Sequence, residues 1–345
     1  MAGSKDGTED RNITDADRQC PQMTTYRERV QNKLSLHPGE VVGKQWKVLR
    51  FIESKKNLAA LKIEKKNDPV PMLQFELFIL LKVEQSKKCK QFCKVLGKGN
   101  EGDYNWITIS LCGKNLRALR KAQPNGKLSL ACGLSVAQQC LKGIEELHKI
   151  GFIHRNVAPS TFAIGKYEGE HSAAELRNIY VLDIGFAHQY VKPDGTLKQP
   201  SPKPWKYVGP IRHMSRNAYM GNELARSDDI EMWYYMTVEL IKGGLPWAHL
   251  RDAKLVFEYQ KACRNGLALR ELLGGLPAEF VDIMKEIDKL SYKDAPNYTE
   301  IYGLLTNAIL FSGKSEFPYD WEAQEVEEFK NPPAAEEKKE GDEKK

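Results

Sequence analysis

The period of the apolar residues changes near residue 110 of this 345-residue chain. Before that point the apolar residues gather in short strand-like runs, at 46–52, 59–63, 93–96 and 105–109. One segment among them, 72–83, repeats apolar residues at helical spacing. Helical spacing then dominates in 128–150, 229–241, 255–273 (interrupted at Asn265-Gly266) and 278–290. A small β-rich part followed by a larger helical part predicts an α+β fold in two lobes.

The composition excludes two broad classes of protein. Hydrophobic residues make up 41% of the chain, which is enough for a core and excludes a wholly disordered protein. No run approaches the ~18 apolar residues of a membrane helix, and the best, 77–81, ends at Lys82. The first residues contain no apolar stretch, and Ala2 stands where a myristoylation signal requires glycine. We therefore expect a soluble, intracellular protein, in the cytoplasm or also in the nucleus.

The cysteines do not form the pattern of a disulfide framework. There are seven, an odd number at irregular spacing, which predicts free thiols in a reducing compartment. Cys89 and Cys93 are four residues apart, but no second Cys or His pair at zinc-finger spacing completes a metal site.

Charge is distributed unevenly along the chain. Residues 322–345 contain nine acidic residues and five lysines, a net charge of −4, so the remainder carries +10. This composition, interrupted by Pro332-Pro333, predicts disorder. We therefore divide the chain into a disordered arm (1–37), a first lobe (38–112), a second lobe (113–315) and a mostly disordered acidic and mixed-charge tail (316–345). We also consider whether this tail folds back on the basic segment 190–216. Neither tail has a basic block dense enough to indicate nucleic acid.

Several short motifs occur in a recognisable order. Ala60-Leu61-Lys62-Ile63 lies on a strand-like run, and Glu76 follows in the predicted helix. The string Gly151-Phe152-Ile153-His154-Arg155-Asn156-Val157-Ala158-Pro159-Ser160-Thr161 and then Asp183-Ile184-Gly185 come later. This set resembles the strand lysine, helix glutamate, catalytic loop and metal-binding motif of protein kinases. The resemblance implies the bilobal protein-kinase fold, with a small β-rich N-lobe and a larger helical C-lobe.

Further motifs narrow the resemblance. Residues 208–215 (VGPIRHMS) and 226–229 (RSDD) are similar to the casein kinase I family. Residues 113–116 (GKNL), 123–126 (QPNG) and 245–247 (LPW) are most similar to its tau-tubulin-kinase-like branch. The resemblance runs from about Gly39 to Asp320 and therefore covers everything except the tails.

The glycine loop that covers phosphate in kinases is missing. There is no glycine between Gly43 and Gly97, and residues 53–57 place side chains where the backbone would approach phosphate. We expect a shortened surface hairpin there. An alternative is that a segment encoding the loop was lost from the predicted chain, which would restore nucleotide binding more easily than catalysis.

The resemblance assigns roles to three residues that match the kinase pattern. Lys62 and Glu76 would form the ion pair that holds phosphate in active kinases, and Asp183 would be the one strong magnesium ligand. These three residues make a residual site for ATP and Mg²⁺, if any remains. Without a glycine loop we favour a structural role for Lys62 and Glu76, and we expect no bound cofactor.

Other catalytic positions depart from the family pattern. Asn156 stands at the catalytic-base position, and an amide cannot accept a proton near neutral pH. Ala158 replaces a phosphate-contacting lysine, Thr161 replaces the metal-binding asparagine, and Pro210 replaces a threonine that steadies the loop. We therefore predict no catalytic residues and a pseudokinase, a signalling scaffold or regulatory protein-binding module. The alternative is a weak or atypical ATP-dependent serine/threonine kinase using Lys62 and Asp183.

We also predict roles for the basic residues of 190–216 and for a set of residues that support the fold. The segment 190–216 is basic, and the resemblance implies that such residues bind anionic groups near the substrate; the candidates are Lys203, Lys206, Arg212 and Arg216. The alternative is a solvated basic loop. We expect the partners to be other proteins with acidic or phosphorylated segments. We expect the chain itself to be a monomer that binds neither nucleic acid nor membrane. The expected scaffold residues are His154, Arg155, Asp229 (anchoring the loop backbone), Trp205, Trp233 and Trp247.

Overall fold

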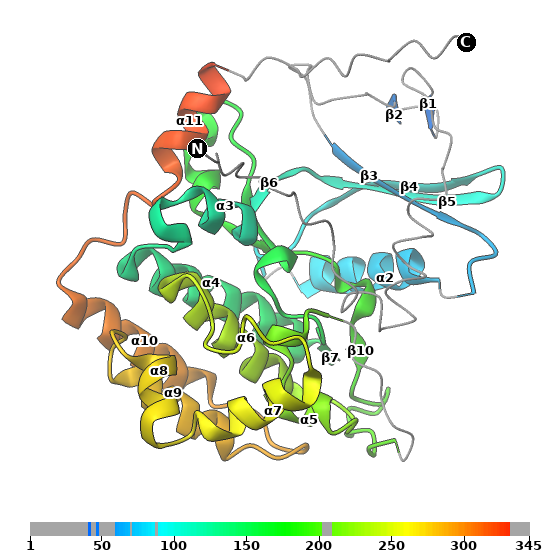
Figure 1. The fold of residues 1–345 in the computed structure, drawn as a ribbon. Coiled ribbons are helices and arrows are strands. Elements are labelled where there is room, and N and C mark those ends of the chain that lie inside the picture. Colours follow the sequence, from blue (N-terminus) through cyan, green and yellow to red (C-terminus); the bar gives the residue numbers. More distant parts are fainter. Residues whose placement is uncertain are drawn as a thin grey trace, which may run out of the picture.

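A small sheet and its helix form the first lobe of the structure, a computed structural model that describes residues 41–42, 46–47, 59–69, 71–86, 89–201 and 209–331. Strands β3 (Ala59–Lys65), β5 (Tyr104–Ser110) and β4 (Val95–Glu101) form an antiparallel sheet in the order β3-β5-β4. Helix α2 (Met72–Ser86) packs between this sheet and the helical part (Figure 1). Two short strands, β1 (Val41–Val42) and β2 (Trp46–Lys47), pair antiparallel. The predicted shortened hairpin at 53–57 lies outside the described residues.

A second sheet joins the two lobes. Strands β6 (Cys112–Asn115), β8 (Phe162–Gly165) and β9 (Ile179–Val181) pair in the order β6-β8-β9. A two-stranded pair, β7 (Phe152–Ile153) with β10 (His188–Gln189), flanks the loop that carries Asn156. Strands β7 and β8 bound this loop, and β9 ends two residues before Asp183. The pairing of β8 with β9 therefore fixes the position of the loop relative to Asp183.

Helices make up most of the second lobe (Figure 1). They are α3 (Leu116–Ala122), α4 (Leu130–Lys149), α5 (Arg216–Tyr219), α6 (Arg226–Lys242), α7 (Ala253–Ala262), α8 (Gly266–Leu273), α9 (Glu279–Asp288), α10 (Tyr298–Ser312) and α11 (Glu322–Lys330). Every residue from Ser227 to Ile241 of α6 is buried, as expected of a helix that is mostly apolar and aromatic. The α+β, two-lobed fold predicted from the sequence is confirmed.

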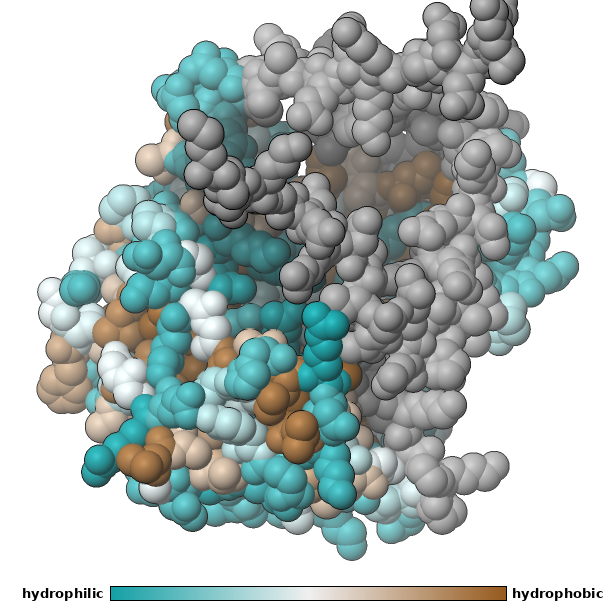
Figure 2. Space-filling model, viewed as in Figure 1, coloured by the Kyte–Doolittle hydropathy of each residue, from teal (hydrophilic) through white to brown (hydrophobic). Residues whose placement is uncertain are grey.

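Two of the three tryptophans predicted to pack lie in the core. Trp233 and Trp247 are fully buried, and the indole N–H of Trp233 donates to the carbonyl of Ala137, 2.9 Å away, joining α6 to α4. Trp205 lies outside the described residues. On the face shown in Figure 2 the described surface is mostly hydrophilic, with apolar side chains in small separate groups. No helix among the described residues is long and apolar enough to cross a bilayer.

The prediction of disorder from residue 322 is wrong for residues 322–330, which form α11. Glu322 accepts two hydrogen bonds from Arg177, at 2.8 and 2.9 Å, and its carboxylate also accepts the backbone N–H of Tyr319. The side chain of Trp321, immediately before the helix, is fully buried. Composition missed this helix because its stabilising contacts come from residues far away in the sequence. Residues 332–345 of the predicted tail lie outside the described part of the chain.

Candidate active site and basic pocket

The lysine and glutamate predicted to pair do so. Lys62 of β3 lies 2.6 Å from the Glu76 carboxylate on α2 and 3.8 Å from the Asp183 carboxylate. Glu64, two residues along β3, accepts the backbone N–H groups of Met72 and Leu73 at 2.7 and 3.0 Å, which satisfies the first turn of α2. Strand β3 therefore fixes the first residue of α2 and places Glu76 of that helix opposite Lys62.

A buried carboxylate holds the backbone of the loop, as expected. Asp229 of α6 accepts the N–H of His154 at 2.6 Å and that of Arg155 at 2.7 Å, and it also contacts the His148 ring at 2.8 Å. Although burial opposes ionisation, these hydrogen bonds and neighbouring imidazoles keep the pKa of Asp229 below its usual value. Arg155 adopts a left-handed backbone, φ 66°, and its guanidinium donates to the carbonyl of Phe186. These contacts fix the backbone of the loop and involve none of the catalytic positions.

His154 is part of the scaffold below the loop. Its ring is fully buried, stacks on Phe162, and lies 3.0 Å from the Leu182 carbonyl. The backbone N–H of Asn156 lies 3.2 Å from its other ring nitrogen. Burial lowers the pKa of His154, which keeps the ring neutral. The geometry agrees with a packing role.

Thr161 directs its hydroxyl into the loop itself. The hydroxyl oxygen lies 2.9 Å from the carbonyl of Asn156 and 3.0 Å from that of Ala158, and it accepts the N–H of Ala158 at 3.2 Å. The residue is 2% exposed. Because a hydroxyl has one proton and two lone pairs, these contacts leave little capacity for a metal ion.

The residues present do not fit the paired magnesium sites of a protein kinase. Such a site uses a carboxylate and a side-chain amide carbonyl. Asp183 supplies a carboxylate that is 53% exposed, with its backbone left-handed at φ 57°. The second position is Thr161, whose hydroxyl is engaged as described. The buried amide oxygen of Asn156 has no hydrogen-bond partner among the described residues.

A basic pocket lies beside this loop. It encloses about 280 Å³ and is lined by Arg117, Arg120, Lys121, Ala158, Pro159, Ser160, Pro210, Arg212, His213 and Glu239. The Glu239 carboxylate lies 3.5 Å from Arg120, 3.4 Å from Arg212 and 2.7 Å from His213. This single acid neutralises only part of the pocket, which therefore keeps an excess of positive charge.

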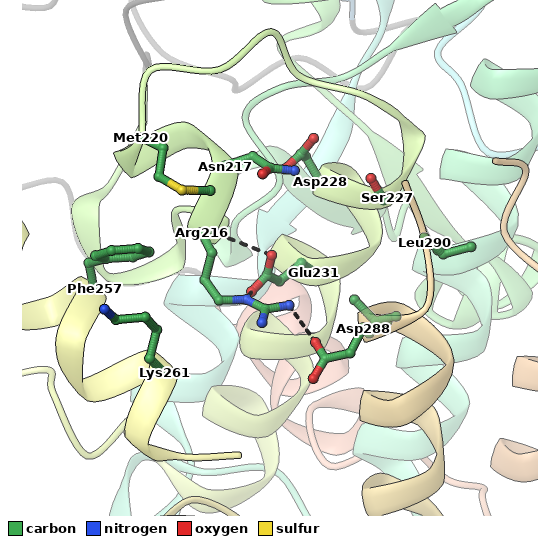
Figure 3. A pocket seen from close by; sticks show the side chains of 11 residues that line it. Arg216, Asn217, Met220, Ser227, Asp228, Glu231, Phe257, Lys261, Asp288 and Leu290 are labelled. Carbon is green, nitrogen blue, oxygen red and sulfur yellow. Dashed lines mark hydrogen bonds and ion pairs between the residues drawn. The ribbon is translucent and has the colours of Figure 1, made fainter. Parts of the chain in front are cut away.

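The predicted anion-binding arginines do not share one site. Arg212 lines the basic pocket, whereas Arg216 lies in a different pocket formed by α5, α6, α7 and α9 (Figure 3). There Arg216 donates to Glu231 at 2.7 Å and pairs with Asp288, and Arg264 pairs with the same two acids. Arg216 is thus held by internal carboxylates. Lys203 and Lys206 lie outside the described residues.

Three basic residues of the pocket were not singled out from the sequence. Arg117, Arg120 and Lys121 all come from α3, whose sequence LRALRKA places basic residues three and four apart. That spacing puts them on one side of a helix, so the signal was present. Which side faces the catalytic loop depends on the packing of α3 against Pro159–Thr161, which the sequence does not state.

Comparison with known proteins agrees with this geometry. No family model matches the chain. A probable serine/threonine-protein kinase of Dictyostelium discoideum is 33% identical over 267 residues, covering 77% of this chain and 51% of that protein. Serine/threonine-protein kinase spe-6 of Caenorhabditis elegans is 29% identical over 299 residues (81% and 76%). Casein kinase I homolog 3 of Schizosaccharomyces pombe is 29% identical over 266 residues (76% and 58%). The chain thus spans about half the length of the Dictyostelium protein.

The two-lobed fold, the paired Lys62 and Glu76 and the anchored loop define a protein-kinase-like domain. With these relatives, the chain belongs to the protein kinase superfamily, in the group related to casein kinase I.

Proposed function

We propose that this protein is a catalytically impaired kinase-like protein, a pseudokinase, that acts as a scaffold or regulatory module by binding other proteins. The observation that carries the proposal is the inward hydrogen bonding of Thr161. It coincides with Asn156 at the base position and Ala158 at the phosphate-contacting position. A general base contributes ~10²–10⁴-fold to rate, so its absence alone weakens catalysis severely. We also propose that the chain belongs to the tau-tubulin-kinase-like branch and acts in the cytoplasm or also in the nucleus.

Nucleotide binding is the first test. The purified full chain is titrated with millimolar ATP, with and without Mg²⁺, while its Tm is measured. A ligand at 100 times its Kd adds about 2.7 kcal/mol of stability, which a thermal shift detects readily. We expect no Mg²⁺-dependent rise in Tm and no phosphate transfer. The variant Asn156→Asp/Ala158→Lys/Thr161→Asn, which restores the family residues, serves as the comparison.

A second candidate function is a weak ATP-dependent serine/threonine kinase. The distance of 3.8 Å between Lys62 and Asp183 favours it, since both side chains are near one another beside the loop. A Mg²⁺-dependent shift in the unaltered protein, abolished by Lys62→Met, together with measurable phosphate transfer would support this candidate and overturn the pseudokinase.

The basic pocket supports acidic or phosphorylated protein segments as the partners. Hydrogen bonds between charged groups contribute about 1.5–3 kcal/mol each. We therefore expect an acidic phosphoserine peptide to bind at low salt, and Arg117→Gln/Lys121→Gln to weaken binding by roughly tenfold or more. Arg251→Gln, at an exposed position, is the matched control. Equal affinity for the phosphorylated and unphosphorylated peptides would contradict this assignment.

A further inference from the structure

Two cysteines meet where the chain crosses between the sheets. Cys93 lies just before β4, in a segment held to the second sheet by the bond from the Val181 N–H to the Gln91 carbonyl (2.7 Å). Cys112 begins β6, directly after β5. Their sulfur atoms are 3.3 Å apart, although the two residues are 19 positions apart in the sequence.

The two thiols are chemically unequal. Cys93 is 6% exposed and Cys112 is partly exposed. The contact with the Cys112 sulfur, supported by Ser110 and the nearby charge of Lys62, holds the pKa of Cys93 below its usual value in spite of burial. The same contact, together with burial, raises the pKa of Cys112. This arrangement sets two sulfur atoms of unequal acidity in contact at 3.3 Å, which suits thiol oxidation.

The other described cysteines lack such a partner. Cys132, Cys140 and Cys263 are buried, and burial raises the pKa of each thiol. Cys89 hydrogen-bonds to Gln91 at 3.4 Å, and burial raises its pKa to about 11. Within the described residues, only the pair at the sheet junction is therefore arranged for a local disulfide.

We propose that Cys93 and Cys112 are a redox modification site that forms an intramolecular disulfide with a hydroperoxide as the oxidant. The Cys93 thiolate attacks one peroxide oxygen, the O–O bond breaks, and Cys93 becomes a sulfenic acid while the other oxygen leaves and is protonated to water. The Cys112 sulfur then attacks the Cys93 sulfur, and its proton and the sulfenic hydroxyl leave as a second water. Both thiols are oxidised and hydrogen peroxide is reduced to two waters. A disulfide measures about 2.05 Å, so the sulfurs approach by roughly 1.3 Å.

The disulfide joins both crossings between the two sheets. Residues 91–93 lead from the second sheet into β4, and Cys112 leads from β5 back into the second sheet, where it pairs with Gly165. Oxidation therefore fixes the junction of the lobes close to Lys62. The inference rests on the positions of the sulfurs and holds whether or not the protein binds ATP.

The experiment uses the full chain, reduced and then exposed to hydrogen peroxide. After the peroxide is removed, remaining thiols are blocked under denaturing conditions and the protein is digested with trypsin without reduction. Cleavage after lysine places Cys93 in peptide 91–94, separate from Cys89, and Cys112 in peptide 99–114. We expect mass spectrometry to show these two peptides linked as the major product. We also expect Tm to rise on oxidation and to return with dithiothreitol.

Two controls separate this site from general oxidation. Cys93→Ser and Cys112→Ser should each abolish the link, whereas Cys140→Ser should retain it. Peroxide treatment in guanidinium should scatter the linkages among the cysteines, because the pairing depends on the fold. If native protein instead yields sulfinic acid at Cys93, links to other cysteines or unmodified thiols as the major product, the proposal is overturned. The unaltered protein gives this answer even if a variant does not fold.

Discussion

At the scale of single residues, the pair Lys62 and Glu76 ties α2 to the sheet. Glu76 is buried, and its carboxylate is matched by the Lys62 ammonium at 2.6 Å. Removing one partner leaves a charge in a partly desolvated position, whereas removing both leaves none. The structural role predicted from the sequence therefore has a measurable signature in stability, independent of any nucleotide.

We expect Lys62→Met and Glu76→Gln each to lower the free energy of unfolding by about 1–3 kcal/mol. The double variant should lose less than the sum, with a coupling of about 1–2 kcal/mol. Urea unfolding of the four proteins measures this cycle. Lys65→Met, at an exposed position of the same strand, is the control and should change stability little. Additive losses would show that the two side chains do not support one another.

Glu239 is a second residue whose ionised side chain stabilises the fold. Burial opposes its ionisation, but the hydrogen bond from His213 and the charges of Arg212 and Arg120 lower its pKa to about 2. Because this pKa lies below the unfolded value of about 4.5, the stabilisation is complete above pH 4.5 and is lost as the pH falls toward 2. The free energy of unfolding measured between pH 4.5 and 2 should therefore depend on the charges of the basic pocket.

We expect Glu239→Gln to be less stable than the unaltered protein at pH 7 by about 2–3 kcal/mol, and the difference to shrink as the pH falls from 4.5 to 2. Denaturant unfolding at several pH values measures it. Glu258→Gln, at an exposed position, should leave the pH dependence unchanged. A difference between the Glu239 variant and the unaltered protein that is constant with pH would refute the assignment.

At the scale of elements, α11 shows how a segment of acidic composition becomes ordered. Lys114 of β6 pairs with Glu325 at 2.8 Å and with Glu328, and Phe329 packs edge-on against Tyr167 at a ring distance of 5.1 Å. Among the described acids of the tail, Glu325 and Glu328 thus contact β6 and Glu322 contacts Arg177. Those contacts are with Lys114 on the sheet that joins the lobes and with Arg177 in the turn before β9, rather than with the basic segment 190–216 considered from the sequence.

We expect Lys114→Met to increase hydrogen exchange in residues 322–330 about three- to tenfold while changing global stability by less than about 1 kcal/mol, since exposed ion pairs contribute little. Hydrogen-exchange mass spectrometry measures both regions at once. Lys127→Met, exposed and distant in sequence from α11, is the control. Unchanged exchange in α11 would mean that Phe329 and Glu322 alone hold the helix.

At the scale of the whole molecule, the two lobes differ in how much they bury. In α6 every residue from Ser227 to Ile241 is buried, and α4 is buried along most of its length, whereas no residue of β3 is fully buried. Protection against exchange follows burial and contact density. The catalytic-loop region therefore rests on the more strongly packed lobe.

We expect the amides of α4 and α6 to exchange only when the whole protein unfolds, so that their opening free energy equals that of global unfolding. We expect the amides of β3 and α2 to exchange through a local opening that has a smaller free energy. Exchange measured across a denaturant series distinguishes the two. Equal protection in both lobes, with the same dependence on denaturant, would show that the molecule unfolds as one cooperative unit.

The sequence by itself determined the two-lobed α+β fold, the pairing of Lys62 with Glu76 and the anchoring of the loop by Asp229. The fold follows from the period of the apolar residues, whereas the pairing and the anchoring follow from the resemblance of the motifs to those of protein kinases. Only the tertiary structure decided that Arg212 and Arg216 face different pockets, that α11 is ordered and that Cys93 meets Cys112. The physical reason is that local pattern sets each element, whereas contacts between distant residues depend on how the packed elements are oriented.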